Sequence, residues 1–135
     1  MKAVHTLLLG TLVAASACGS STPTSPTVTT TVEQFSSRIQ EKGSAWRSVN
    51  VTTAGNVMLQ LVSLSQVDAV VNIGIGTISG SQCVIAASVD TAANATAVAA
   101  QVTRTVPVGT YCVRIADIGN LTQLVDFTIR IEKPL

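Results

Sequence analysis

From Val32 to the C-terminus the chain is a series of short runs rich in Val, Thr and Ile, and turn residues separate these runs. The breaks include E-K-G at 41–43, T-A-G at 53–55, P-V-G at 107–109 and G-N at 119–120. Side chains branched at Cβ are stiff at χ1 and pack well on a pleated surface. We therefore predict an all-β domain over residues 32–135, a single antiparallel β-sandwich of about seven or eight strands with jelly-roll or immunoglobulin-like order.

Two of the runs indicate how their strands are buried. In the last run apolar and polar residues alternate, so one face of the strand supplies core side chains. That face holds Val125, Phe127, Ile129 and Ile131, and the other holds Asp126, Thr128 and Arg130. The run 57–64 is apolar on both faces, which predicts a central strand.

The N-terminal segment is typical of an export signal. Lys2 provides a positive charge, residues 7–15 form an apolar run too short to cross a bilayer, and the small residues A-S-A stand directly before Cys18. This arrangement resembles the lipobox of bacterial lipoproteins, in which the cysteine is acylated and becomes the first residue of the mature chain. The resemblance implies a lipoprotein signal peptide over 1–17 and lipidation of Cys18. The alternative is an ordinary A-x-A signal peptide, whose cleavage leaves Cys18 as a free N-terminal thiol.

A tether separates the lipidated cysteine from the domain. Residues 18–31 comprise Cys18 and an uncharged Ser/Thr/Pro-rich linker, which cannot bury a core and is expected to be disordered. At about 3.3 Å per residue, the linker reaches at most roughly 40 Å. The partner at this end is the lipid bilayer, reached through the acylated cysteine, and the expected location is the cell envelope. Because Gly19 rather than Asp follows the cysteine, the lipoprotein resemblance implies the outer membrane in a Gram-negative organism.

The domain carries a second resemblance. The pattern V-x-V-x-x-A-G at 49–55, L-x-L at 59–61 and V-P-V-G-T-Y-C-V-R-I at 106–115 is similar to the bacterial pre-peptidase C-terminal domain. This resemblance implies a β-sandwich with an accessory role on secreted proteins, often beside proteases. Some relatives bind calcium through acidic residues after the third strand. Here that region, 65–69, contains a single carboxylate, Asp68, so no metal site is expected.

Cys83 and Cys112 remain as a pair once Cys18 is assigned to the lipid anchor. An exported domain meets an oxidising compartment, which favours a disulfide between them. Closing a loop of about 29 residues stabilises a fold by roughly 3–4 kcal/mol in the chain-entropy model. Alternation places Cys112 on the face opposite Tyr111, so we expect the bond near the sheet surface or at a strand–loop contact. A redox-active pair is the alternative, which the lack of a C-x-x-C motif disfavours.

Few residues are suited to catalysis. The single histidine, His5, lies in the signal segment, so His-based triads and His-ligated zinc are not expected in the mature chain. The four aspartates are scattered along the chain, and we interpret them as solvated residues of turns and strand faces: Asp68, Asp90, Asp117 and Asp126. We therefore predict no catalytic residues, no metal and no cofactor. A carboxylate-based enzyme stays as a remote alternative.

The glycine-rich run G-I-G-T-I-S-G at 74–80 superficially suggests a phosphate-binding loop. Its spacing is not G-x-G-x-x-G, and no lysine follows it. We instead expect these glycines to mark a β-bulge or a close backbone approach.

Trp46 is the candidate ligand platform. Strict alternation along its run places Val49 and Val51 on one face and Trp46 with Ser48 and Asn50 on the other. An exposed indole can contact a sugar or a partner protein. The alternative, which the sequence favours, is a structural role, because a bulge near Arg47 would turn the ring into the core.

Composition and charge narrow the function class. Eight basic and seven acidic residues form no basic patch, so no nucleic-acid partner is expected. The leading hypothesis is a cell-envelope lipoprotein that displays a non-catalytic binding or accessory module for a protein or polysaccharide. The alternative is a structural subunit of an envelope or extracellular assembly, which pairs through exposed strand edges such as residues 98–106.

Overall fold

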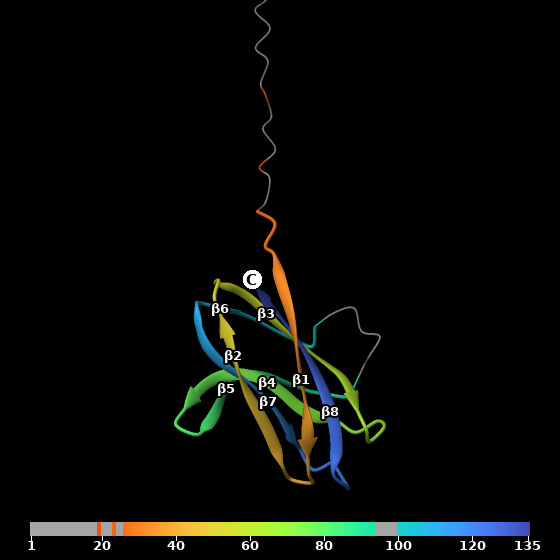
Figure 1. Ribbon diagram of the computed structural model, residues 1–135. Coiled ribbons are helices and arrows are strands. Elements are labelled where there is room, and N and C mark those ends of the chain that lie inside the picture. Colours follow the sequence, from red (N-terminus) through yellow and green to blue (C-terminus); the bar gives the residue numbers. More distant parts are fainter. Residues whose placement is uncertain (1–18, 20–22, 24–25, 94–99) are drawn as a thin grey trace, which may run out of the picture.

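The computed structural model describes Gly19, Pro23 and residues 26–93 and 100–135. These residues contain no helix long and apolar enough to cross a membrane. They form the strands β1 (Thr30–Ile39), β2 (Ser44–Val51), β3 (Gly55–Leu64), β4 (Val71–Ser79), β5 (Gln82–Thr91), β6 (Val102–Val106), β7 (Gly109–Asp117) and β8 (Val125–Pro134). Two four-stranded antiparallel sheets pack together (Figure 1), which confirms the predicted all-β sandwich. The predicted signal peptide (1–17) and Cys18 lie outside the described residues.

The strand order is that of a jelly roll. One sheet has the order β1-β8-β3-β6 and the other β2-β7-β4-β5. Because β1 pairs with β8, β2 with β7, β3 with β6 and β4 with β5, the chain runs as one long hairpin whose successive pairs alternate between the sheets. Antiparallel pairings of β3 with β8 and of β4 with β7 complete the two sheets. Of the two strand orders expected from the sequence, the jelly-roll order is the observed one.

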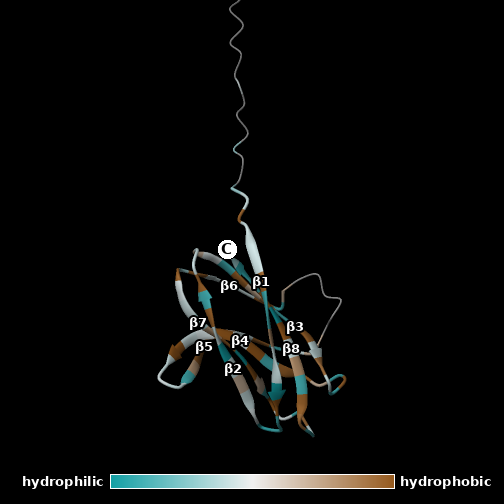
Figure 2. Cartoon of the chain, in the orientation of Figure 1, coloured by the Kyte–Doolittle hydropathy of each residue, from teal (hydrophilic) through white to brown (hydrophobic). Residues whose placement is uncertain are grey.

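The core between the sheets is mostly aliphatic. All four apolar residues that alternate along β8 are buried, and β3 lies between β8 and β6, so both burial predictions are confirmed. Figure 2 shows the resulting bands of hydrophobic and hydrophilic residues along the strands. Phe35 packs edge-on against Phe127 with ring centroids 5.0 Å apart. Tyr111 is half-buried against this core, and its hydroxyl donates a hydrogen bond to the carbonyl oxygen of Pro107 at 2.9 Å.

The first strand begins earlier than predicted. β1 starts at Thr30, two residues before the predicted domain boundary at Val32. Thr30 and Thr31 extend the ladder with β8 by pairing with Pro134 and Lys133. The low-complexity composition of this segment predicts a tether up to residue 31. Thr30 and Thr31 are instead part of a strand, because the C-terminal end of β8 pairs with them, and composition does not indicate such a partner.

A carboxylate joins two turns at the end of the sandwich opposite the start of β1. Asp117 accepts hydrogen bonds from the backbone N–H groups of Lys42, Gly119, Asn120 and Leu121. These bonds, above all the one from Lys42, lower the pKa of Asp117 from its ordinary value of 3.8. Since the folded-state pKa is depressed, the stabilisation is present above the ordinary pKa and is lost as pH falls through the folded-state value. The bond from Lys42 also fixes the turn that precedes β2.

Two glycines of β4 allow β5 to lie close against it. A Cβ atom at Gly76 would overlap the carbonyl oxygen of Val84, and a Cβ atom at Gly74 would lie 2.7 Å from the carbonyl oxygen of Ala87. A register shift just before Gly76 marks a β-bulge in the same strand pair. The prediction that the run 74–80 marks a bulge or a close backbone approach is therefore confirmed.

We predict that Gly76→Ala destabilises the domain by about 3 kcal/mol, the upper end of the range for overpacking, because the new methyl group must displace the backbone of β5. Gly109→Ala is the matched control, since its Cβ would meet only the ring of Tyr111 at 3.6 Å, an ordinary contact. Urea denaturation measures both changes in the free energy of unfolding. Equal losses in the two variants would contradict the close approach as the cause.

Candidate functional site

The candidate site lies on the outer face of the sheet β2-β7-β4-β5. Trp46 on β2 lies opposite Arg114 on β7, and Arg114 lies opposite Gly74 on β4. The β2–β7 register is continuous along the whole of β2, so no bulge turns the indole inward. Trp46 is 36% exposed, whereas Val49 and Val51, which face the core, are 1% and 0% exposed. The structure therefore places Trp46 outside the core, on the side given by strict alternation.

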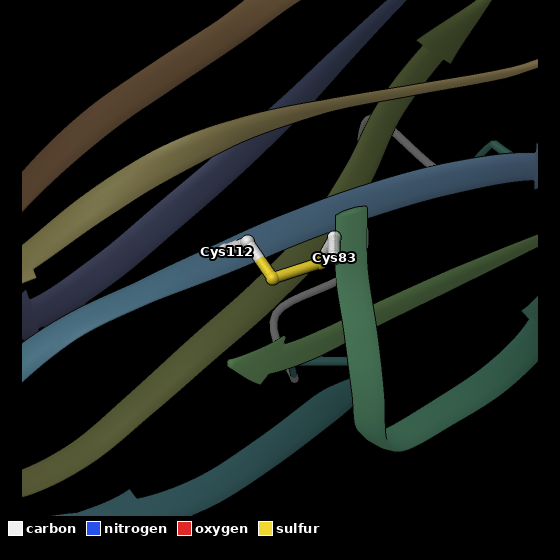
Figure 3. The surroundings of a disulfide bond; sticks show 2 residues. All are labelled: Cys83 and Cys112. Carbon is white, nitrogen blue, oxygen red and sulfur yellow. A yellow bond between two sulfur atoms is a disulfide. The ribbon is translucent and has the colours of Figure 1, made fainter. Parts of the chain in front are cut away.

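The predicted disulfide between Cys83 and Cys112 is confirmed, with the two Cα atoms 5.7 Å apart. Figure 3 shows that it joins the start of β5 to β7. Cys112 lies on the outer face of the sheet, opposite Ser48 of β2 and Gly76 of β4, and neither cysteine belongs to the central core cluster. The expected position near the surface needs one correction, because Cys83 and Cys112 are only 5% and 0% exposed.

The burial of the disulfide follows from the path of β5. In a flat sheet β5 and β7 would be about 10 Å apart, because β4 lies between them. The Cα separation of 5.7 Å therefore requires the start of β5 to fold over the outer face of β4 towards β7. Gly74 and Gly76 leave the space that this backbone occupies. The folded strand then covers the disulfide and forms one wall of a cleft.

The cleft has a volume of about 290 Å³. It is lined by Ser44 and Trp46 of β2, Ser81 and Gln82 of the β4–β5 hairpin, Cys83 of β5 and Arg114 of β7. Four of these residues, those of β2 and of the hairpin, are exposed, so the cleft opens to solvent. Its lining combines one aromatic ring, three neutral polar side chains and one positive charge. We call this group of six residues the Trp46 cleft.

Arg114 is the one charged residue of the Trp46 cleft, and it is half-buried. Its Nε atom is buried and has no hydrogen-bond partner, and its guanidinium forms no ion pair with any described residue. In contrast, Arg38, Arg47 and Arg130 each pair with a carboxylate. A buried donor without a partner costs about 1–3 kcal/mol, and no described carboxylate neutralises the charge of this guanidinium.

Two of the other hollows illustrate why the Trp46 cleft is better suited to recognition. One of about 490 Å³ lies over the ion pair between Arg38 and Asp126, whose side chains are 66% and 67% exposed. These charges neutralise each other and are well solvated, so they offer a ligand little. The other, of about 260 Å³, is mainly apolar and lies where β1 begins, between Val28 and Pro134. In contrast to these two hollows, the Trp46 cleft combines an aromatic face with a charge that has no ion-pair partner among the described residues.

The lining of the Trp46 cleft is suited to binding. It contains no carboxylate and no histidine that could act as a general base for the hydroxyl of Ser44 or Ser81. Across the described ranges, the structure contains no group of three or more His, Cys, Asp or Glu residues that could hold a metal ion. What the cleft offers is an aromatic surface, hydrogen-bond donors and acceptors, and one positive charge.

Sequence reasoning identified Trp46 and Cys83 but not the other members of the cleft. Alternation alone puts Arg114 on the outer face with Cys112, yet only the β2–β7 register makes it the neighbour of Trp46. No pattern in the sequence indicates that the hairpin residues Ser81 and Gln82 belong to the cleft, because they reach it only when β5 folds over β4. The predicted edge 98–106 is described only in part, since residues 98 and 99 lie outside the described ranges, and β6 forms one edge of its sheet.

No protein-family model matches the chain, and a comparison with curated proteins finds no match.

Removing the disulfide with the double variant Cys83→Ser/Cys112→Ser is expected to lower the free energy of unfolding by about 3–4 kcal/mol, because a closed loop of this length restricts the unfolded chain. Urea denaturation of the oxidised wild type, the reduced wild type and the double variant provides the comparison. The reduced wild type should match the double variant. An oxidised wild type no more stable than either would contradict a stabilising role for the bond.

Proposed function

We propose that this protein is a non-catalytic binding module of the cell envelope, which is held to the lipid bilayer through acylated Cys18 and binds a ligand in the Trp46 cleft. The observation that carries the proposal is the position of Trp46 on the outer face of a sheet, in a polar cleft, rather than in the core. The resemblance to the pre-peptidase C-terminal domain supports the same accessory role.

The distribution of aromatic residues supports a binding role for Trp46. The chain has four aromatic residues, of which Phe35 and Phe127 pack together in the core and Tyr111 packs against it. The largest of the four remains partly in solvent. Aromatic side chains with an apolar body and a polar tip are the residues that most often anchor ligands and partners. An exposed indole beside hydroxyl and amide groups is therefore suited to a sugar or a polypeptide.

The position of the cleft supports display away from a membrane. The tether enters at the start of β1, and β1 runs its full length before the turn that leads to β2 (Figure 1). Ten strand residues span roughly 33 Å. Ser44 and Trp46 stand near the beginning of β2, at the end of the sandwich far from the tether. A ligand in the surrounding medium can reach this end when the other end is anchored.

A second candidate function is assembly through strand edges. β5 is an edge strand of its sheet, and Val84 of this strand is 52% exposed. Ile78, on the adjacent strand β4 near the same hairpin, is 37% exposed. Apolar side chains beside an unpaired strand edge favour pairing with another chain.

The binding function is tested by capture from envelope extract with wild type and Trp46→Ala. We expect Trp46→Ala to lose the captured ligand by at least about tenfold, the loss typical of an aromatic anchor, and still to unfold cooperatively because the ring is outside the core cluster. Val84→Lys is the control for assembly through the β5 edge. If Trp46→Ala captures the same ligands as wild type and Val84→Lys loses them, the strand edge rather than the cleft is the interaction site.

The anchor is tested by metabolic labelling with a palmitate analogue in a bacterial host. We expect the wild type to be labelled and to fractionate with membranes, and Cys18→Ser to lose the label and leave the membrane fraction, because the thiol is the acylation site. Cys83→Ser is the matched control and should keep the label. Label that persists on Cys18→Ser would contradict the lipid anchor.

A further inference from the structure

Arg114 is held in place before any ligand arrives. Its cross-strand neighbours are Trp46 on one side and Gly74 on the other, and the backbone of β5 lies over Gly74. The side chain is thus confined between an aromatic ring and a folded-over strand that the disulfide fixes. Because this arrangement exists in the free protein, a ligand does not have to order the guanidinium when it binds.

The charge of Arg114 is also uncompensated. No acidic residue lines the Trp46 cleft, and the guanidinium has no ion-pair partner in the described part of the chain. Guanidinium groups present a planar fork of donors that matches a carboxylate in a bidentate contact. An anionic group pairs with this charge, whereas a neutral ligand offers the guanidinium only uncharged acceptors.

We propose that the ligand of the Trp46 cleft is a saccharide that carries a carboxylate, such as a uronic acid unit of a polysaccharide. This inference rests on the proposed binding function and names its ligand class. The apolar face of the sugar ring stacks on the indole of Trp46, and the carboxylate pairs with Arg114. The two side chains project from directly opposed residues of adjacent strands, about 5 Å apart at Cβ, so one sugar ring with its carboxylate contacts both.

The rest of the cleft fits this ligand. Ser44, Ser81 and Gln82 supply hydroxyl and amide groups that can both donate to and accept from sugar hydroxyls. The volume of about 290 Å³ lies at the lower limit of small-molecule sites, which suits one sugar unit within a longer chain that continues into solvent. An acidic peptide could also supply a carboxylate, but it lacks the rigid ring whose apolar face covers an indole.

The test is isothermal titration of the full chain in detergent with three probes, namely a galacturonate trimer, the neutral galactose trimer and a tetraglutamate peptide. We expect the wild type to bind the galacturonate trimer at least about tenfold more tightly than the neutral trimer, as expected for a charge-assisted bidentate contact. Binding of the galacturonate trimer should weaken as salt rises. Tetraglutamate should bind no better than the neutral trimer.

Variants assign the preference to the cleft. Arg114→Gln should lose the preference for galacturonate and its salt dependence, so that it binds the two trimers with about equal affinity. Arg104→Gln on β6 removes the same charge elsewhere, forms no ion pair in wild type within the described residues, and should bind as wild type does. Trp46→Ala should lose both sugars. Unfolding midpoints check that each variant folds, and Arg114→Lys, which keeps the charge without the fork, should retain part of the preference.

The outcomes separate this inference from the proposed function. If both trimers bind equally and Trp46→Ala abolishes both, the carboxylate preference is wrong and the binding function stands. If tetraglutamate binds as tightly as galacturonate, the ligand is an acidic peptide and the saccharide assignment is wrong. Failure of the wild type to bind galacturonate overturns the inference. Binding that Trp46→Ala leaves unchanged overturns both the inference and the cleft as the binding site.

Discussion

The close approach of β5 to the outer face of β4 is the constraint on which the candidate site depends. Gly74 and Gly76 have no side chains, so the backbone of β5 rests where side chains would otherwise stand, and the bond between Cys83 and Cys112 fixes it there. An edge hairpin without this contact would continue the twist of the sheet and leave the outer face of β4 uncovered. The cleft beside Trp46 is therefore a product of backbone packing as much as of side-chain chemistry.

The core explains why a tryptophan can remain outside it. The inward positions of both sheets are filled mainly by Val, Ile and Leu, and one edge-on pair, Phe35 with Phe127, supplies the aromatic packing. Full burial of a large apolar side chain stabilises a fold by about 1.5–3 kcal/mol. Trp46 does not contribute this full stabilisation, because it is 36% exposed. The indole instead lies beside Arg114 and neutral polar groups, a setting that serves contact with a ligand better than it serves stability.

Local patterns predicted the features that depend on one strand alone. The alternation of β8 follows from a period of two along a single run, and the central position of β3 follows from a run that is apolar on both faces. A period of two also gives the outward side of Trp46, although the sequence left open a bulge that would turn the ring inward. The features that depend on register were not predictable in the same way. Pairing between segments far apart in the chain decides which residue of β7 lies opposite Trp46. The distance between Cys83 and Cys112 depends on such pairing and also on a β-bulge, whose position cannot be predicted from composition.

The disulfide makes the candidate site dependent on the redox conditions around the protein. The bond between Cys83 and Cys112 holds the wall of the cleft that β5 forms, and such bonds persist in oxidising compartments and are rare in the reducing cytosol. In a reduced chain the loop closure that stabilises this wall is lost, so the arrangement of Trp46, Arg114 and the hairpin tip would no longer be fixed. The Trp46 cleft is therefore completed in oxidising surroundings, which is where the proposed lipid anchor on Cys18 would place the domain.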